Sequence, residues 1–409
     1  MERVVITGLG TVNPLGLDPE TSWKNAMAGV TTTGPIKQFD ASRLPVPIAC
    51  EVKDFDPTKY VDVRSARRME RFQQYAMAAA RQAVDQSGLD VRANADRVGV
   101  VISSAVGGIQ TLQEAAKVLL TLGPRKLSPF TIPMLMPNGA AGWVSIEFGA
   151  RGPAYSVASG CASGADGVGS AWRLIRSGEM DAVIAGASDA TLCELAMGAF
   201  LRVGAMTSGE SLNVPRPFDK NRDGLVAGEG AAVLVMESLG SARKRGAKIL
   251  AELAGYGSTS DAFHITAPTQ DGSGSARAIE HALASAGIKP DEVDYINAHG
   301  TGTVLNDLSE TKAIKRVFRE RAYKIPISST KSMTGHMMGT TGALEAIFCT
   351  MVIRDGTIPP TIHYTTPDPE CDLDYVPNVG RTQPVKVAIS NAFGFGGHNA
   401  VLVIRSFKE

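Results

Sequence analysis

The chain has 409 residues, 44% of them apolar and 20% charged, which is the composition of an ordinary globular protein. Its 41 basic and 41 acidic residues cancel, so the overall charge gives no reason to expect a nucleic-acid partner. No uncharged apolar run is long enough for membrane insertion, and five scattered cysteines without a CxxC pair argue against a disulfide framework or a cysteine zinc site. We therefore expect a cytoplasmic protein without a bound metal ion.

The predicted elements begin with a strand over 4–8. A secreted protein would carry a signal peptide here, and this segment does not have the pattern of one. A helix over 71–87 should end at Gly88, which suits a left-handed cap, and lead to a strand over 98–102. The same order of helix, glycine and strand returns over 276–296. This second occurrence is the first sign that the chain is internally repeated.

A clearer repeat joins the segments 228–238 and 396–406, which lie 168 residues apart. Upstream of them, Cys161 and His336 each lie in a turn of small residues that precedes a helical stretch. A repeat of this length indicates two pseudo-symmetric α/β halves rather than a solenoid. Equivalent turns of two such halves face one another, so we expect the Cys161 turn to lie near the His336 turn.

The predicted strands are apolar with few polar interruptions, as expected when helices cover both faces of a sheet. We place the N-terminal half, with the cysteine turn, at 1–245, and the C-terminal half, with two histidines and a lysine, at 246–409. The two halves should share one core.

Cys161 lies between a predicted strand and a predicted helix, with small residues on both sides over 157–164. This is the layout of a nucleophile elbow, in which a tight turn presents a side chain at a helix N-terminus. The helix dipole there favours the thiolate, the reactive form of cysteine. A buried structural cysteine is the alternative, and we assign that role to the other four: Cys50, Cys193, Cys349 and Cys371.

Three further stretches carry candidate chemistry. His299 follows a predicted strand within the sequence His-Gly-Thr-Gly-Thr, and Lys331 precedes His336 by five residues. Each histidine, taken alone, also fits a satisfied loop or core position. The glycine-rich turn 393–397 leaves backbone N–H groups free to form an oxyanion hole, although it also fits a plain tight turn.

Together these stretches resemble the β-ketoacyl-[acyl-carrier-protein] synthases, a branch of the thiolase-like fold, and most closely the elongating type II kind. The resemblance covers essentially the whole chain, with the motifs in the family's order. It implies a five-layered α-β-α-β-α core, a homodimer and an acyl carrier protein as partner. It implies no cofactor, because the substrates are carried on the phosphopantetheine of the carrier.

The resemblance also implies the roles of the site residues. Cys161 accepts the acyl chain, and His299 and His336 donate hydrogen bonds to the malonyl thioester carbonyl as decarboxylation builds an enolate. Lys331 orients His336 and sets the local field. Backbone N–H groups of Cys161 and Phe395 hold the oxyanion of the condensation step.

Further roles follow from the same resemblance. Thr301 and Thr303 bind the pantetheine arm, and Glu345 pairs with Lys331. Phe395 and Asp261 gate the entrance. The end of the acyl chain is expected near Val106, Phe200 and Met134, and the acidic carrier protein near Arg64, Arg67, Arg68, Arg125 and Lys126.

Some positions depart from the family's usual residues: Ser159, Gly160, Gly302, Val304 and His398. At positions 302 and 304 the chain resembles the synthases of aromatic polyketide pathways. A polyketide ketosynthase, with or without a non-identical partner, is therefore the main alternative. A degradative thiolase is disfavoured because Cys349 and Cys371 lack a glycine-rich turn, and an initiating Cys-His-Asn synthase because the second position is His336. A non-catalytic chain-length subunit would typically lack Cys161.

Overall fold

The computed structural model describes residues 2–408, and within them ten strands form one continuous sheet. Its order is β10-β9-β13-β14-β8-β1-β7-β6-β4-β5. The first half of the chain supplies β1 (Val4–Val12), β4 (Val98–Ser103), β5 (Ala154–Tyr155), β6 (Ala182–Asp189) and β7 (Gly230–Ser238). The second half supplies β8 (Ala251–Ser260), β9 (Tyr295–Asn297), β10 (Ile327–Ser328), β13 (Val387–Gly394) and β14 (His398–Arg405).

The two halves of this sheet repeat one topology. In the first half the strands are adjacent in the order β1-β7-β6-β4-β5, and the four successive pairs are antiparallel, antiparallel, parallel and parallel. In the second half the order is β8-β14-β13-β9-β10, and the four pairs have the same orientations. β7 and β14, which contain the 168-residue repeat, occupy equivalent places. The halves join where Val5 pairs with Glu252 and Ile6 with Ala251.

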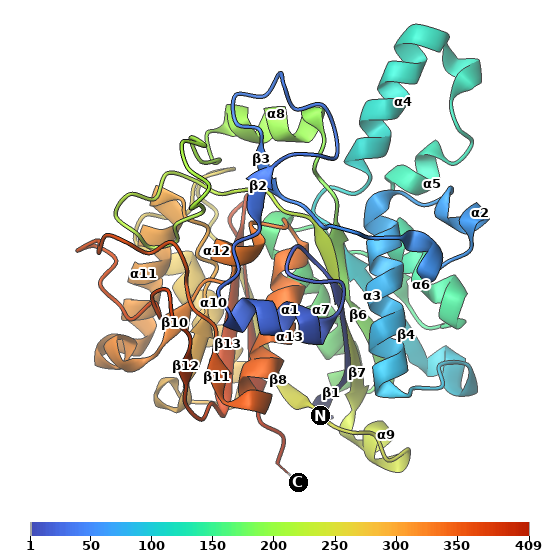
Figure 1. Ribbon diagram of the computed structural model, residues 1–409. Coiled ribbons are helices and arrows are strands. Elements are labelled where there is room, and N and C mark those ends of the chain that lie inside the picture. The colour runs from blue at the N-terminus through green and yellow to red at the C-terminus, as the bar shows by residue number, and fades with distance from the viewer. Residues whose placement is uncertain (1, 409) are drawn as a thin grey trace.

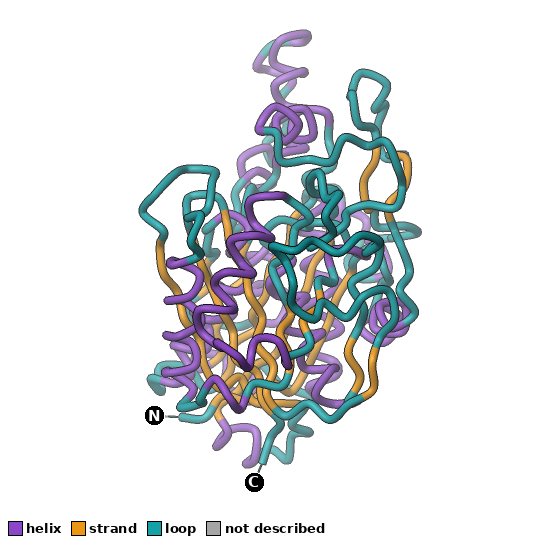
Figure 2. Tube along the Cα trace, turned by 90° about the vertical axis from the view of Figure 1, so that its left-hand side faces the viewer, coloured by secondary structure: helices purple, strands orange, loops and turns teal. Residues whose placement is uncertain are grey.

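Helices pack closely against the strands (Figure 2), and their contacts place one pair between the two halves and another pair outside each half, in the order of the expected α-β-α-β-α core. α7 (Ser163–Arg176) and α13 (Thr340–Asp355) contact strands of both halves. α3 (Arg71–Ser87) and α6 (Gly139–Phe148) cover the first half, and α10 (Ser273–Ala286) and α11 (Val304–Phe318) cover the second. Every residue from 340 to 352 of α13 is buried, as expected for a central helix.

Local signals explain where the outer helices begin and end. Glu70 and Gln73 form a capping box at the start of α3, and Gly88, with φ of 63°, ends it in the left-handed conformation. Gly287 ends α10 in the same way, with φ of 65°. α10 begins at Ser273, three residues before the predicted start.

The remaining helices and strands lie outside the ten-stranded sheet and the six helices named above, and among the described residues none of the helices is long and apolar enough to cross a membrane. α4 projects from the body of the molecule (Figure 1), and none of its residues is buried. These elements are α1 (Pro19–Met27), α2 (Val63–Ala66), α4 (Ile109–Leu122), α5 (Thr131–Leu135), α8 (Glu194–Val203), α9 (Leu239–Lys244), α12 (Lys331–Thr334), β2 (Thr33–Pro35), β3 (Ile48–Cys50), β11 (Thr357–Ile358) and β12 (Arg381–Thr382).

Candidate active site

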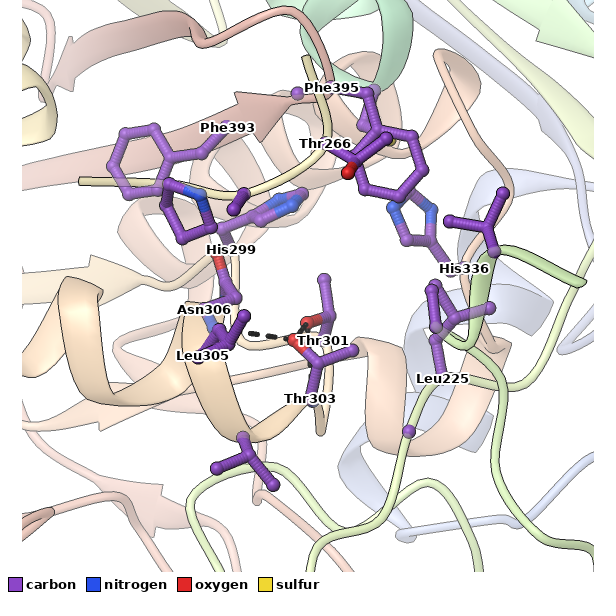
Figure 3. A pocket seen from close by; sticks show the side chains of 18 of the residues that line it. Leu225, Thr266, His299, Thr301, Thr303, Leu305, Asn306, His336, Phe393 and Phe395 are labelled. Carbon is purple, nitrogen blue, oxygen red and sulfur yellow. Dashed lines mark hydrogen bonds between the residues drawn. The ribbon is translucent and has the colours of Figure 1, made fainter. Parts of the chain in front are cut away.

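A cavity of about 280 Å³ lies beyond the carboxyl ends of the parallel strands, where the two halves meet. Loops that leave β5, β9 and β13 bring Cys161, His299 and Phe395 to its wall, and the turn after α12 adds His336. Figure 3 shows the two imidazoles and the Phe395 ring around one central space. Sites of open α/β sheets lie at this edge because successive strand ends converge there.

Cys161 lies in a single 3₁₀ turn, Gly160–Ala162, immediately before α7. Gly160 has φ of 58°, a conformation that glycine adopts without strain. Ser163 fixes the turn from inside, because its Oγ accepts from the Ser159 N–H at 2.9 Å and donates to the Gly160 carbonyl at 2.6 Å. The turn is thus a tight elbow that presents the thiol to the cavity, as the sequence predicts.

Burial raises the pKa of the Cys161 thiol to about 11, while the Phe395 backbone N–H and the Lys331 charge act in the opposite direction. Part of the Cys161 side chain faces the cavity. The protein that surrounds the sulfur nevertheless keeps water away, and without water a negative charge on the sulfur is poorly stabilised. The resting thiol is therefore protonated. This differs from the sequence prediction of a thiolate, because desolvation outweighs the nearby dipoles.

The two histidine rings meet edge to face, with centroids 5.5 Å apart. Burial, and after it the Lys331 charge, lowers the pKa of His336 to about 3 and that of His299 well below its usual range. Both rings are therefore neutral near pH 7. The Met338 backbone N–H donates to Nδ1 of His336 at 3.1 Å, which leaves the ring hydrogen on Nε2 as a donor.

Lys331 and Glu345 form a fully buried ion pair, with Nζ 2.6 Å from Oε1. Burial raises the pKa of Glu345 to about 8, and Lys331 opposes that rise. Among the described residues Lys331 donates to Glu345 and not to His336. Its influence on His336 is therefore exerted through its charge, which keeps the imidazole neutral.

The Phe395 turn supplies backbone donors and part of the entrance. The backbone N–H groups of Phe395 and of Cys161 itself both lower the pKa of the thiol, against the effect of burial. The Asp261 N–H donates to the Gly397 carbonyl at 2.8 Å, and the Gly396 N–H donates to the Ile265 carbonyl at 2.7 Å. The loop after β8 is thus bound directly to the Phe395 turn, as a shared gate requires.

The predicted substrate residues divide into two groups. Thr301, Thr303, Phe200 and Asp261 line the cavity, and the two threonine hydroxyls lie 2.9 Å apart (Figure 3). Val106 does not line it. Its N–H faces Asp189 at 3.4 Å on the loop after β4, while Met134, also outside the lining, packs against the neighbouring glycine turn.

The predicted docking residues lie on two segments of the chain. α2 ends at Ala66, so of the first three arginines only Arg64 is helical, and the Arg68 guanidinium covers the Phe130 ring at 4.7 Å. Arg125 and Lys126 follow the far end of α4 (Figure 1), and Phe130 lies four residues beyond Lys126. Their role in binding a carrier protein stays a prediction.

Several residues that support the site escaped sequence analysis. Asp189, fully buried, accepts from Ser104 Oγ at 2.6 Å and from the Thr340 N–H at 3.2 Å, and burial raises its pKa to about 7. Glu310 accepts from the N–H groups of His299 and Gly300, each at 2.8 Å. Both carboxylates lie inside ordinary strand or helix patterns, so no local motif distinguishes them. Leu225, Leu305 and Asn306 also line the cavity, and no local motif distinguishes them either.

Comparisons with known proteins agree with this site. Residues 1–242 match the family described as Beta-ketoacyl synthase, N-terminal domain, and residues 250–365 match Beta-ketoacyl synthase, C-terminal domain. The chain is 48% identical over 409 residues to the 3-oxoacyl-[acyl-carrier-protein] synthase 2 of Staphylococcus aureus (strain COL), an alignment that covers 100% of this chain and 99% of that relative.

Two solved structures match over 100% of both chains. One is the ishigamide ketosynthase/chain length factor, with a TM-score of 0.93 and 38% identity. The other is AntDE:AntF, described as a type II PKS acyl-carrier protein in complex with its ketosynthase bound to the hexaketide, with a TM-score of 0.92 and 36% identity. Because family profiles match both halves and a curated relative aligns from end to end, the chain belongs to the beta-ketoacyl synthase family of condensing enzymes.

Proposed function

We propose that this enzyme elongates acyl chains on an acyl carrier protein by decarboxylative Claisen condensation, with Cys161 as the nucleophile. The observation that carries the proposal is one cavity lined by a thiol, two neutral imidazoles and the glycine-rich Phe395 turn, whose backbone lowers the pKa of the thiol. These are the groups that the reaction needs, since it forms an acyl-cysteine and two successive oxyanions.

In the first half-reaction the Cys161 sulfur attacks the thioester carbonyl of the acyl carrier protein. The tetrahedral oxyanion accepts hydrogen bonds from the N–H groups of Cys161 and Phe395. The pantetheine sulfur leaves and takes up the proton that the thiol loses. A protonated resting thiol suits this exchange, because the proton has to be delivered to the leaving group.

In the second half-reaction malonyl-carrier protein loses carbon dioxide, and the electron pair of the broken C–C bond forms an enolate. His299 and His336 donate to the enolate oxygen as its charge grows, and neutral rings with fixed donors stabilise it without a proton transfer. The enolate carbon then attacks the acyl-Cys161 carbonyl. The sulfur leaves, and a β-ketoacyl chain two carbons longer remains on the carrier.

The substrate class follows from the relatives. The 48% identity to 3-oxoacyl-[acyl-carrier-protein] synthase 2 exceeds the 36% and 38% to the two ketosynthase structures, so fatty-acid elongation is the proposed pathway. An acyl carrier protein is the proposed partner, as it is for the ketosynthase of the type II PKS complex. A polyketide ketosynthase is the second candidate, because the ketosynthase structure of that complex matches the whole chain.

A homodimer is also proposed, formed across the β5 edge of the sheet. At the opposite edge the Asp374 carbonyl accepts from Ile327 of β10, whereas β5 pairs only with β4 among the described residues. α6, which packs beside β5, exposes 73% of Ile146, and the projecting helix α4 exposes 85% of Leu120. An uncovered strand edge flanked by apolar side chains suits a second copy related by a twofold axis.

The test is a condensation assay with malonyl-carrier protein and acyl-carrier proteins of several chain lengths. Cys161→Ala should abolish condensation while Cys371→Ala, a buried cysteine outside the cavity, should retain it. A preference for linear saturated acyl chains supports fatty-acid elongation, and turnover only with polyketide intermediates or a second subunit supports the alternative. Condensation by folded Cys161→Ala at the rate of the unaltered protein would refute the proposed nucleophile.

A further inference from the structure

A chain of hydrogen bonds runs from the Cys161 turn to a strand of the other half. Ser159 Oγ donates to Oδ2 of Asp166 at 2.5 Å, and the Tyr256 hydroxyl donates to Oδ1 of the same carboxylate at 2.5 Å. Asp166 lies in the first turn of α7, and Tyr256 lies on β8. The three side chains therefore connect the residue two places before the nucleophile to the C-terminal half.

The three residues are almost completely buried, with Ser159 and Asp166 7% exposed and Tyr256 6% exposed. A buried carboxylate is costly unless both of its oxygens are hydrogen-bonded, and here each accepts one hydroxyl. Its place in the first turn of α7 also suits the helix dipole. Burial first, and then the Asp166 charge, raise the pKa of Tyr256, so the phenol keeps its hydrogen and remains a donor.

The Tyr256 ring is held closely against α7. A Cβ added at Gly169, one helical turn beyond Asp166, would lie 2.5 Å from ring atoms of Tyr256. The Arg173 guanidinium, one further turn along α7, covers the ring at 4.8 Å. The ring cannot approach α7 more closely without displacing these neighbours, and the hydroxyl is presented to Asp166.

The Ser159 end of this chain is continuous with the reacting groups. The Ser159 carbonyl and the Cys161 nitrogen lie 2.8 and 2.9 Å from the place that a Cβ at Gly394 would occupy. The turn that carries the sulfur therefore packs directly on the end of β13, from which Phe395 follows. A shift of Ser159 would change the distance between the Cys161 and Phe395 N–H groups, which have to converge on one oxygen.

We propose that Ser159, Asp166 and Tyr256 are positioning residues that hold the Cys161 turn in register with the Phe395 N–H during acyl transfer. This inference rests on the proposed role of Cys161 as nucleophile. It assigns the three residues to the acylation step rather than to decarboxylation, because His299 and His336 come from other loops. The resemblance to the family does not assign these roles, because Ser159 departs from the residue that the family usually has at this position.

The experiment compares Tyr256→Phe and Asp166→Asn with the unaltered protein in two separate assays. Intact-mass kinetics follow the acylation of Cys161 by acyl-carrier protein, and release of carbon dioxide follows the decarboxylation of malonyl-carrier protein. We expect acylation to slow about tenfold, in line with the sensitivity of oriented reactions to small displacements, with decarboxylation within about twofold of the unaltered rate.

Matched variants separate position from stability. Tyr375→Phe removes a comparable buried hydroxyl, which lies 2.8 Å from Thr311 and far from the turn in the sequence, and should leave acylation unchanged. Ser159→Ala should slow acylation, and Ser159→Thr, which keeps the hydroxyl, should restore it. Thermal unfolding of each variant shows whether a slow rate merely follows lost stability.

Two outcomes overturn the inference. Acylation of Tyr256→Phe and Asp166→Asn at the unaltered rate would show that the hydrogen bonds do not position the turn. An equal fall in acylation and decarboxylation, in proportion to the loss of stability, would show a purely structural role. Absence of acyl-Cys161 in the unaltered protein is a distinct result, because it refutes the nucleophile itself and this inference with it.

Discussion

At the scale of single residues, burial sets the protonation states of the site. The same desolvation keeps the thiol protonated and both imidazoles neutral, since it penalises whichever form carries charge. Lys331 strengthens the effect on the histidines and weakens it on Cys161, because a fixed cation repels an imidazolium and attracts a thiolate. One buried ion pair thus adjusts all the reacting groups.

The pH dependence of Cys161 alkylation follows from its pKa of about 11. The thiolate is the reactive form and exists only as a small fraction below that pKa, so the rate should rise about tenfold per pH unit from pH 7 to 10. Iodoacetamide labelling of Cys161, read by peptide mass spectrometry, measures it. An unfolded peptide spanning 157–164 is the control and should level off near pH 8.5. A plateau near pH 7 in the folded protein would instead support the thiolate that the sequence predicts.

At the scale of elements, the approach of α7 to α13 decides how the nucleophile meets the histidine. The Gly164 N–H donates to the Gly339 carbonyl at 3.0 Å, and these glycines lie three residues after Cys161 and three after His336. A Cβ at Gly164 would lie 2.3 Å from the Gly339 carbonyl oxygen. Only glycine therefore allows this contact without displacement of the backbone.

Gly164→Ala should consequently separate the two turns. Because the obstructing atom is backbone, we expect a loss of about 2 kcal/mol in the free energy of unfolding, together with slower condensation. Chemical denaturation and the condensation assay measure the two effects. Gly240→Ala on α9, where an added Cβ meets no atom within 4 Å, is the control and should be neutral or slightly stabilising. Unchanged stability and rate in Gly164→Ala would contradict this account of the contact.

At the scale of the whole molecule, the duplicated halves create the cavity that neither would form alone. Cys161 comes from the first half, and His299, His336 and Phe395 come from the second. The repeat of 168 residues was sufficient to predict this meeting, because equivalent strand ends must converge across a pseudo-twofold axis. The boundary at residue 245 stays a prediction.

The proposed dimer is also a property of the whole molecule, and Ile146→Asp should weaken it. A charge on this 73% exposed side chain beside β5 would have to be desolvated on association. Sedimentation velocity should show a dimer for the unaltered protein and at least a tenfold weaker association for the variant. Val379→Asp alters a side chain that is 74% exposed elsewhere and is the matched control. Equal association of Ile146→Asp would place the interface on another surface.

Sequence patterns were enough to predict the two α/β halves, the nucleophile elbow and the histidine turns, because strand period, glycine caps and small-residue turns are local signals. The protonated thiol and the position of Val106 outside the cavity emerge only once the chain is folded. The same is true of the contact of Ser159, Asp166 and Tyr256. These features depend on how completely water is excluded from each group and on contacts between side chains of the two halves. Residues that neighbour each other in the chain determine neither of them.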